Sequence, residues 1–179
     1  MNNSILLLTL ISLICLSCDS QNDDNLYKTQ FPKDWVKYAD DYYQICHPDS
    51  LELDTNFNSL HFILRSKKVG ENDFCDNLNV FQMAASYKDD QDMQEQLTNE
   101  VYDLLSNAKI TNAHKVTSNG REFLKLKGYG DFYDQEMAFE QYFTRIDTLL
   151  YGITFTGLKK DEDKYFPLFR DIMTTIVIK

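Results

Sequence analysis

The stretch that decides the fold is residues 110–129, ITNAHKVTSNGREFLKLKGY. Apolar and polar residues alternate on both sides of Asn119-Gly120, a dipeptide that strongly favours a two-residue β-hairpin turn. The same period of two continues through the next part of the chain. The sequence therefore predicts four successive antiparallel strands, at Ile110–Ser118, Arg121–Tyr129, Glu136–Arg145 and Leu149–Thr156.

Two predicted helices and several shorter strands flank these four strands. The first helix is expected to begin at Asp92, because Asp92 and Glu95 have the spacing of a capping box, and to end near Asn107. A second helix is predicted over Asp163–Thr174, with Pro167 acceptable only in its first turn. Shorter strands are predicted at residues 41–46, 51–53, 60–66, 77–85 and 176–178.

An uncharged apolar run occupies residues 5–17 and stops at Cys18, where a polar segment begins. The run is too short to span a hydrocarbon core of ~30 Å and has the length of a signal-peptide h-region. The apolar run, the small residue Ser17 and then Cys18 together resemble a bacterial lipoprotein signal, in which a peptidase cuts just before the cysteine. The resemblance implies that Cys18 carries the lipid anchor of the mature protein. An ordinary secretory peptide, cleaved nearby, is the alternative.

This resemblance gives the chain three parts: a signal peptide at 1–17, a polar tether at 18–30 and a single domain at 31–179. The acyl chains on Cys18 are expected to hold the protein on a membrane, since each buried methylene contributes ~0.8 kcal/mol. Asp19, directly after the lipid cysteine, resembles the inner-membrane retention signal of enteric bacteria, whereas the Asp- and Ser-rich run at 19–24 resembles an export tag for the outer-membrane surface and favours the second location. We expect a cell-envelope protein, anchored in the outer membrane and facing the periplasm or the surface.

The composition is that of an ordinary globular domain with a marked acidic excess. Among 179 residues, 18 Lys and Arg stand against 28 Asp and Glu, which gives a formal net charge of −10. Nucleic-acid affinity depends on Lys and Arg that release counterions from phosphates, so this balance argues against a nucleic-acid partner. With only 6 Gly, the chain has little room for phosphate-binding loops, and we expect no cofactor.

Three short motifs resemble the PsbP-like (Mog/PsbP) superfamily, which includes photosystem extrinsic proteins and several bacterial lipoproteins. They are YQICHP at 43–48, DNLNV at 76–80 and the chain end at 165–178. The resemblance covers Trp35–Ile178 and implies an α+β fold, an α/β/α sandwich of helices around an antiparallel sheet. It supplies no shared catalytic residues, because members mostly bind proteins or assist assemblies. Leu51, where many members have Trp, departs from the pattern.

The titratable side chains form no catalytic or metal-binding motif. His47, His61 and His114 lack the spacing of a hydrolase or a zinc enzyme, and we interpret them as surface or strand residues of a non-enzymatic protein. Acidic clusters at 88–92 and 159–164 contain the carboxylates that Ca²⁺ prefers. Both clusters lie at predicted helix starts, where carboxylates cap free N–H groups, so we expect capping and no metal site.

Two cysteines, Cys46 and Cys75, remain in the predicted domain. An oxidising compartment permits a disulfide between them, and closing a loop of about 30 residues would contribute about 3 kcal/mol in the chain-entropy model. One cysteine ends a predicted strand and the other precedes one, so the sequence does not show that their Cα atoms approach within ~7 Å. Two separate, half-buried thiols are the alternative.

Three aromatic residues are the candidates for contact with a partner. Tyr129, Phe132 and Tyr133 surround Gly128 and Gly130, which together predict a bend. Aromatic side chains in such a loop suit recognition, since Tyr is common at interfaces where one end is apolar and the other is wet. Packing into the core is the alternative for each of them.

The sequence thus predicts a lipid-anchored, non-catalytic binding or accessory protein of the bacterial envelope. Its expected contacts are the membrane, through the lipid on Cys18, and an envelope protein as partner. The alternative is a carrier of a small molecule or a metal ion, which would bind in a cleft between helix and sheet.

Overall fold

The computed structural model describes residues 25–26, 32–56, 60–67 and 74–179. Its helices are α1 (Asp90–Leu104) and α2 (Glu162–Met173), and the short 3₁₀ helix η1 (Lys159–Asp161) precedes α2. Its strands are β1 (Asn25–Leu26), β2 (Trp35–Ala39), β3 (Tyr43–Pro48), β4 (Leu51–Asp54), β5 (Phe62–Ser66), β6 (Asn77–Ala84), β7 (Ser106–Ser118), β8 (Arg121–Phe132), β9 (Gln135–Ile146), β10 (Leu149–Leu158) and β11 (Val177–Ile178).

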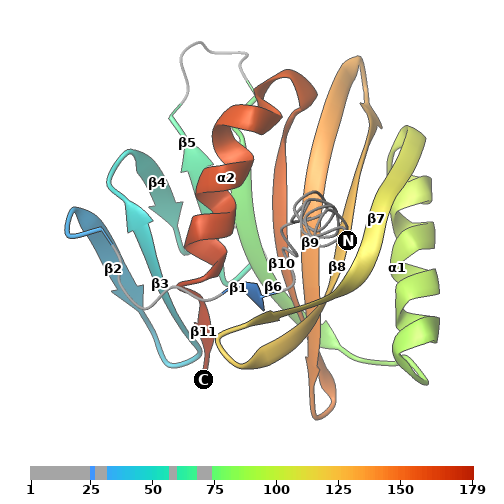
Figure 1. Ribbon diagram of the computed structural model, residues 1–179, viewed down its shortest axis with the longest axis horizontal. Helices are drawn as coiled ribbons and strands as arrows, with labels where there is room; N and C mark the ends of the chain where they lie inside the picture. The colour runs from blue at the N-terminus through green and yellow to red at the C-terminus, as the bar shows by residue number, and fades with distance from the viewer. Residues whose placement is uncertain (1–24, 27–31, 57–59, 68–73) are drawn as a thin grey trace, which may run out of the picture.

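The strands form an 8-stranded sheet of order β1-β7-β8-β9-β10-β6-β5-β4 and a 3-stranded sheet of order β11-β3-β2 (Figure 1). The four predicted strands are confirmed as the antiparallel run β7 to β10. Asn119 and Gly120 have φ of 49° and 73°, as a hairpin turn with two left-handed residues requires. Strand β6 then pairs with the far edge of β10, so strands from both sides of α1 in the sequence share one sheet.

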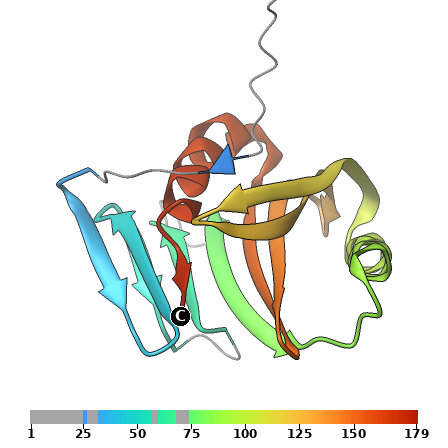
Figure 2. The ribbon, with the colours of Figure 1, turned by 60° about the horizontal axis from the view of Figure 1, so that its bottom comes forward.

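The large sheet is covered differently on its two faces. Helix α2 and the small sheet cover one face, where they enclose the larger core, and α1 covers part of the other (Figure 2). The predicted α+β fold, a sandwich of helices around an antiparallel sheet, is confirmed. The larger core is rich in fully buried aromatic side chains: Tyr43, Phe62, Tyr142, Phe155, Phe166 and Phe169.

A buried charge network fixes α2 on the sheet. Glu140 of β9 is fully buried and accepts hydrogen bonds from the Arg170 guanidinium of α2 and from the Tyr142 hydroxyl. The ammonium of Lys125, itself buried, lies 3.5 Å from the same carboxylate. Burial alone would raise the pKa of Glu140, but Arg170 and Lys125 outweigh it and hold this pKa below its ordinary value.

The start of α1 corrects one sequence prediction. The N-cap is Asp89, three residues before the predicted Asp92, and its side chain accepts a hydrogen bond from the Asp92 N–H. Asp92 instead accepts from the backbone N–H of Lys88, so the two carboxylates satisfy donors on both sides of the helix start. The helix also ends earlier than predicted, at Leu104, because β7 already begins at Ser106.

Two further predictions differ from the structure. Pro167 lies beyond the first turn of α2, since the helix begins at Glu162 and η1 leads into it. Residues 25–26, predicted as part of the tether, form β1 and pair in parallel with the end of β7. The predicted signal peptide at 1–17 and the predicted lipidation site Cys18 lie outside the described residues. Within the described residues, no helix is both long and apolar enough to span a membrane.

Candidate functional site

A cleft with a volume of about 340 Å³ lies between the end of α1 and the large sheet. Residues from the end of α1 form its roof, strands β6, β9 and β10 form its floor, and Phe132 and Phe74 lie at its rim. We call it the α1 cleft. Its lining residues are Phe74, Asn77, Asn79, Val101, Leu104, Leu105, Phe132, Met137, Phe139, Gln141, Thr154 and Thr156.

The floor of the α1 cleft is built by the register of three neighbouring strands. Asn79 of β6, Thr154 of β10 and Gln141 of β9 are direct cross-strand partners and form one polar row. The next row consists of Asn77, Thr156 and Phe139. Since directly opposed residues point to the same face, the sheet brings amide and hydroxyl groups together under the apolar roof.

Two aromatic rings continue this face of the sheet next to the polar row. Phe81 and Phe143 stand in the row beyond Gln141, with ring centroids 6.3 Å apart in an edge-to-face arrangement. Gly152 lies between them in register, and a Cβ atom there would come within 2.2 Å of the Phe81 ring. The glycine therefore gives Phe81 the space to lie across the sheet.

Among the described residues that line the α1 cleft, none has a charged side chain, although the chain as a whole carries −10. Its asparagines are partly satisfied: Asn77 Nδ2 donates to the carbonyl of Cys75 at 3.1 Å, and Asn79 Nδ2 donates to Asn77 Oδ1 at 3.3 Å. In contrast, Oε1 of Gln141 is buried and accepts no hydrogen bond from the described residues. The cleft thus offers a neutral, mostly apolar surface, and a buried acceptor without a partner among the described residues belongs to one of its lining side chains.

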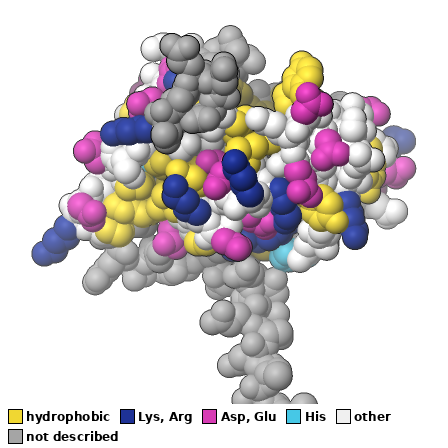
Figure 3. Space-filling view, turned by 90° about the horizontal axis from the view of Figure 1, so that it is seen from above, with side chains coloured by type: hydrophobic (Ala, Val, Ile, Leu, Met, Phe, Trp, Pro, Cys, Tyr) yellow, Lys and Arg dark blue, Asp and Glu magenta, His cyan; other side chains and the backbone are white. Residues whose placement is uncertain are grey.

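Two of the predicted recognition residues lie where β8 turns into β9: Phe132 ends β8 and Tyr133 follows it in the turn. We call these two residues the hairpin tip. Phe132 is 40% exposed and Tyr133 is 88% exposed. Their ring centroids lie 4.6 Å apart, edge to face. Figure 3 views this end of the molecule and shows apolar side chains gathered among basic and acidic ones. The hairpin tip adjoins the α1 cleft, because Phe132 also lines the cleft.

The third predicted residue, Tyr129, does not join the hairpin tip. The predicted bend at Gly128 and Gly130 is wrong, because β8 runs through both glycines to Phe132. Tyr129 faces the opposite side of β8, where its ring lies 5.3 Å from the ammonium of Lys159. A Cβ atom on Gly128 would come within 2.4 Å of the carbonyl oxygen of Lys109, so the glycine serves close packing against β7.

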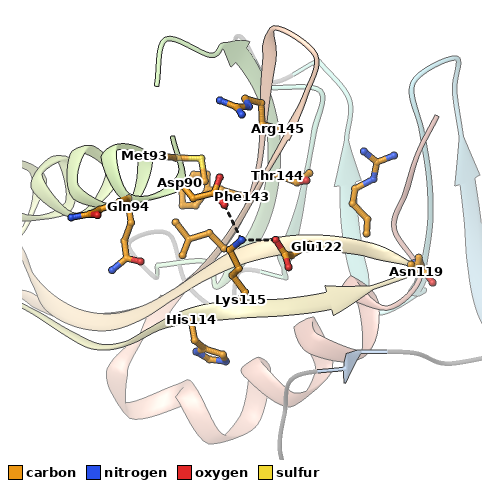
Figure 4. Close-up of a pocket in the computed structure, with 14 residues that line it drawn as sticks. Asp90, Met93, Gln94, His114, Lys115, Asn119, Glu122, Phe143, Thr144 and Arg145 are labelled. Carbon is orange, nitrogen blue, oxygen red and sulfur yellow. Dashed lines mark hydrogen bonds and ion pairs between the residues drawn. The ribbon is translucent and has the colours of Figure 1, made fainter. Parts of the chain in front are cut away.

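A second, larger and more polar cleft of about 730 Å³ lies at the start of α1 (Figure 4). The ammonium of Lys115 lies 2.8 Å from Asp90 and 2.7 Å from Glu122, and the hydrogen bonds to these carboxylates raise its pKa. These partners neutralise Lys115. His114 extends to the other side of β7 from Lys115, so the two side chains do not converge on a common point.

The structure separates the other candidate residues. His47 is buried in β3, with Nδ1 3.0 Å from the Pro48 carbonyl oxygen, and the ring of His61 packs 4.7 Å from that of Tyr43. Within the described ranges, no three His, Cys, Asp or Glu residues group as metal ligands.

The disulfide considered from the sequence is absent, because Cys46 and Cys75 are both free thiols. Cys46 lies in β3 of the small sheet, whereas Cys75 lies two residues before the start of β6 in the large sheet. The backbone N–H of Cys46 donates to the Thr175 hydroxyl at 2.8 Å, and that hydroxyl donates back to the Cys46 carbonyl at 3.1 Å. These bonds hold the strand on the α2 side of the molecule.

Comparison with known proteins identifies the fold. No family model and no curated protein matches the sequence. Among solved structures, cyanobacterial PsbP from Synechocystis sp. PCC 6803 superimposes with a TM-score of 0.57 at 14% identity, over 85% of this chain and 96% of that one. The chain has the PsbP-like fold. The chain also resembles two further solved structures in fold.

LpqN of Mycobacterium tuberculosis, described as involved in cell envelope biogenesis, has a TM-score of 0.61 at 12% identity, over 81% of this chain and 89% of that one. PA94 of Pseudomonas aeruginosa, of unknown function, has a TM-score of 0.58 at 13% identity, over 81% of this chain and 97% of that one. At these identities, the PsbP-like likeness establishes the fold alone, since one fold hosts many functions.

The sequence did not predict the α1 cleft as a set of residues. Its only signal was polar residues at alternate strand positions, Asn77 with Asn79 and Thr154 with Thr156. Alternation places each pair on one face of its own strand. The two pairs share a face because β6 pairs with β10. In the sequence, α1 and β7 to β9 separate these two strands, so no local pattern shows this pairing.

Proposed function

We propose that this chain is a lipid-anchored, non-catalytic protein of the bacterial envelope that binds a partner protein through the hairpin tip. The anchoring part of the proposal is supported by the apolar run at 5–17 followed by Cys18. The envelope setting is supported by the likeness in fold to LpqN, which is itself described as an envelope biogenesis protein. An outer-membrane location belongs to the same proposal.

The observation that carries the binding role is the conformation of Tyr133. Its φ of 52° lies in the left-handed region, where Gly, Asn and Asp are favoured and a bulky residue is strained by about 1 kcal/mol or more. Its side chain is 88% exposed and so contributes little to the core. A turn that served stability alone would carry Asn or Gly here. An exposed aromatic residue in this position suits the contact surface of a protein partner.

The geometry of the strands supports a tip that faces away from the membrane. Strand β1, the described part of the chain closest to Cys18, pairs with Thr117–Ser118 at one end of β7. The hairpin tip lies beyond the other end, where Ser106 pairs with Asp131. The length of β7 at ~3.3 Å per residue separates the two by roughly 40 Å.

Photo-cross-linking in living cells tests this proposal. A photoreactive phenylalanine analogue replaces Tyr133 in one variant of the full chain and Tyr42 in a control variant. Tyr42 is also an exposed aromatic residue, 57% accessible, but it precedes β3 in the small sheet. We expect a discrete covalent adduct from position 133 and none of that mass from position 42. Identical adducts from both positions, or none from position 133, would refute the proposal.

A further inference from the structure

We propose that the α1 cleft binds one small, uncharged molecule with a largely apolar body and an N–H or O–H donor. This site is separate from partner binding at the hairpin tip, although Phe132 borders both. The cleft volume of about 340 Å³ lies within the range of about 300–1,000 Å³ that is usual for small-molecule sites.

The charge of the cleft selects the ligand class. Its lining residues are seven apolar and five amide or hydroxyl side chains. A charged group that entered would lose its hydration without gaining an opposite charge, which disfavours ions strongly. This absence of charge stands out in a chain with 28 acidic and 18 basic residues, and it indicates a neutral occupant.

The distribution of polar atoms sets the orientation of the ligand. The roof and rim are apolar, with Val101, Leu104 and Leu105 from the α1 end, whereas the polar row of Asn79, Thr154 and Gln141 lies on the floor. The apolar body of the ligand would therefore pack against the helix and its donor would point at the sheet.

The need for a donor follows from Gln141. Its buried Oε1 accepts no hydrogen bond from the described residues, a state that costs free energy and is rare for buried polar atoms. The terminal amide torsion of glutamine is soft, so a rotation about it would let this oxygen face the cleft that Gln141 lines. A ligand N–H or O–H would then satisfy it, which gives the cleft a means to prefer donors over purely apolar molecules.

A matched set of fluorescent probes tests the inference on the full chain with Cys18→Ala, which carries no lipid. N-phenyl-1-naphthylamine is neutral, apolar and has one N–H. Its 8-sulfonate derivative keeps the same rings but adds a negative charge, and its N-methyl derivative lacks the donor. We expect saturable one-to-one binding of the parent probe, at least about tenfold weaker binding of the sulfonate, and several-fold weaker binding of the N-methyl compound.

Variants place the probe in the cleft. Thr156→Trp fills the cleft, and Thr111→Trp makes the same change at an exposed position of β7 as the control. The affinity for the parent probe should fall at least about tenfold in Thr156→Trp and should stay unchanged in Thr111→Trp. Any background from the rest of the chain is the same in both. Thermal melting verifies that each variant is folded.

Gln141→Leu tests the donor contact directly. It keeps the approximate size of the side chain but removes the acceptor, so the parent probe and the N-methyl compound should bind with equal affinity. If a folded Thr156→Trp variant binds the parent probe as the control does, or if the sulfonate binds as tightly as the parent, the inference is wrong. Either result leaves the cross-linking test of the hairpin tip unaffected.

Discussion

Arg170 of α2 donates hydrogen bonds to both carboxylate oxygens of Glu140 in β9, with Nε 3.1 Å from Oε1 and 3.0 Å from Oε2. The pair joins the last helix to the centre of the large sheet, and Lys125 adds a second cation beside the same buried carboxylate. Glu140 has no exposed surface, so its charge depends on these partners for compensation. The contact therefore attaches α2 and also supplies a sensitive test of the fold.

We predict that Arg170→Leu destabilises the protein by about 3 kcal/mol, because it leaves a buried carboxylate with only part of its compensation. Urea unfolding followed by circular dichroism measures the change. Lys115→Met is the control, since Lys115 forms ion pairs with Asp90 and Glu122 at an exposed site. The control should unfold at nearly the wild-type midpoint. Equal midpoints for wild type and Arg170→Leu would show that the network does not hold α2.

The pH dependence of stability gives a second prediction. Because Arg170 and Lys125 outweigh burial, the pKa of folded Glu140 lies below its ordinary value of 4.5. A carboxylate of this kind stabilises the fold fully above pH 4.5, and the contribution disappears as the pH falls through the folded pKa. The stability difference between wild type and Glu140→Gln should thus be constant near neutral pH and shrink in acid. A difference that grows as the pH falls would reverse the sign of our assignment.

The cysteines provide a third prediction. Both are free, and burial raises the pKa of the Cys46 thiol, which lowers its reactivity. In purified protein without reductant, iodoacetamide should label Cys75 before Cys46, and urea should expose both to rapid labelling. Mass spectrometry of peptides distinguishes the two sites. A native mass that is two hydrogens lower, restored by reductant, would instead demonstrate the Cys46–Cys75 bridge.

A fourth prediction separates stability from recognition at the hairpin tip. Tyr133→Gly removes the side-chain strain at a φ of 52°, so the melting temperature should stay the same or rise. Cross-linking from a probe at Phe132 should nevertheless fall sharply, because the exposed ring is gone. A large drop in melting temperature would assign Tyr133 to the core, as the alternative interpretation of the sequence has it.

Local patterns in the sequence were sufficient for much of the fold. The Asn119-Gly120 turn and the alternation around it predict β7 and β8, because both signals act within a few residues. The sequence predicted the N-cap of α1 at Asp92, whereas the structure has it at Asp89. Several neighbouring acidic residues could serve as the cap, and the sequence does not show which of them lies beside a free N–H.

The candidate site was less accessible to prediction, because it depends on contacts between distant segments. Gly128 suggests a bend by itself, yet in the structure it permits close packing of β7 on β8. The polar row of Asn79, Thr154 and Gln141 joins strands separated by α1 and several other elements. No local pattern contains that register, so the α1 cleft emerges only from the assembled sheet.

Lipid anchoring at Cys18 is tested by the intact mass of the protein extracted from membranes of cells that express the full chain. We expect a mass equal to residues 18–179 plus an acylated glyceryl adduct, with the adduct on the peptide that begins with Cys18. An unmodified chain cleaved at another residue, recovered without membranes, would contradict lipid anchoring.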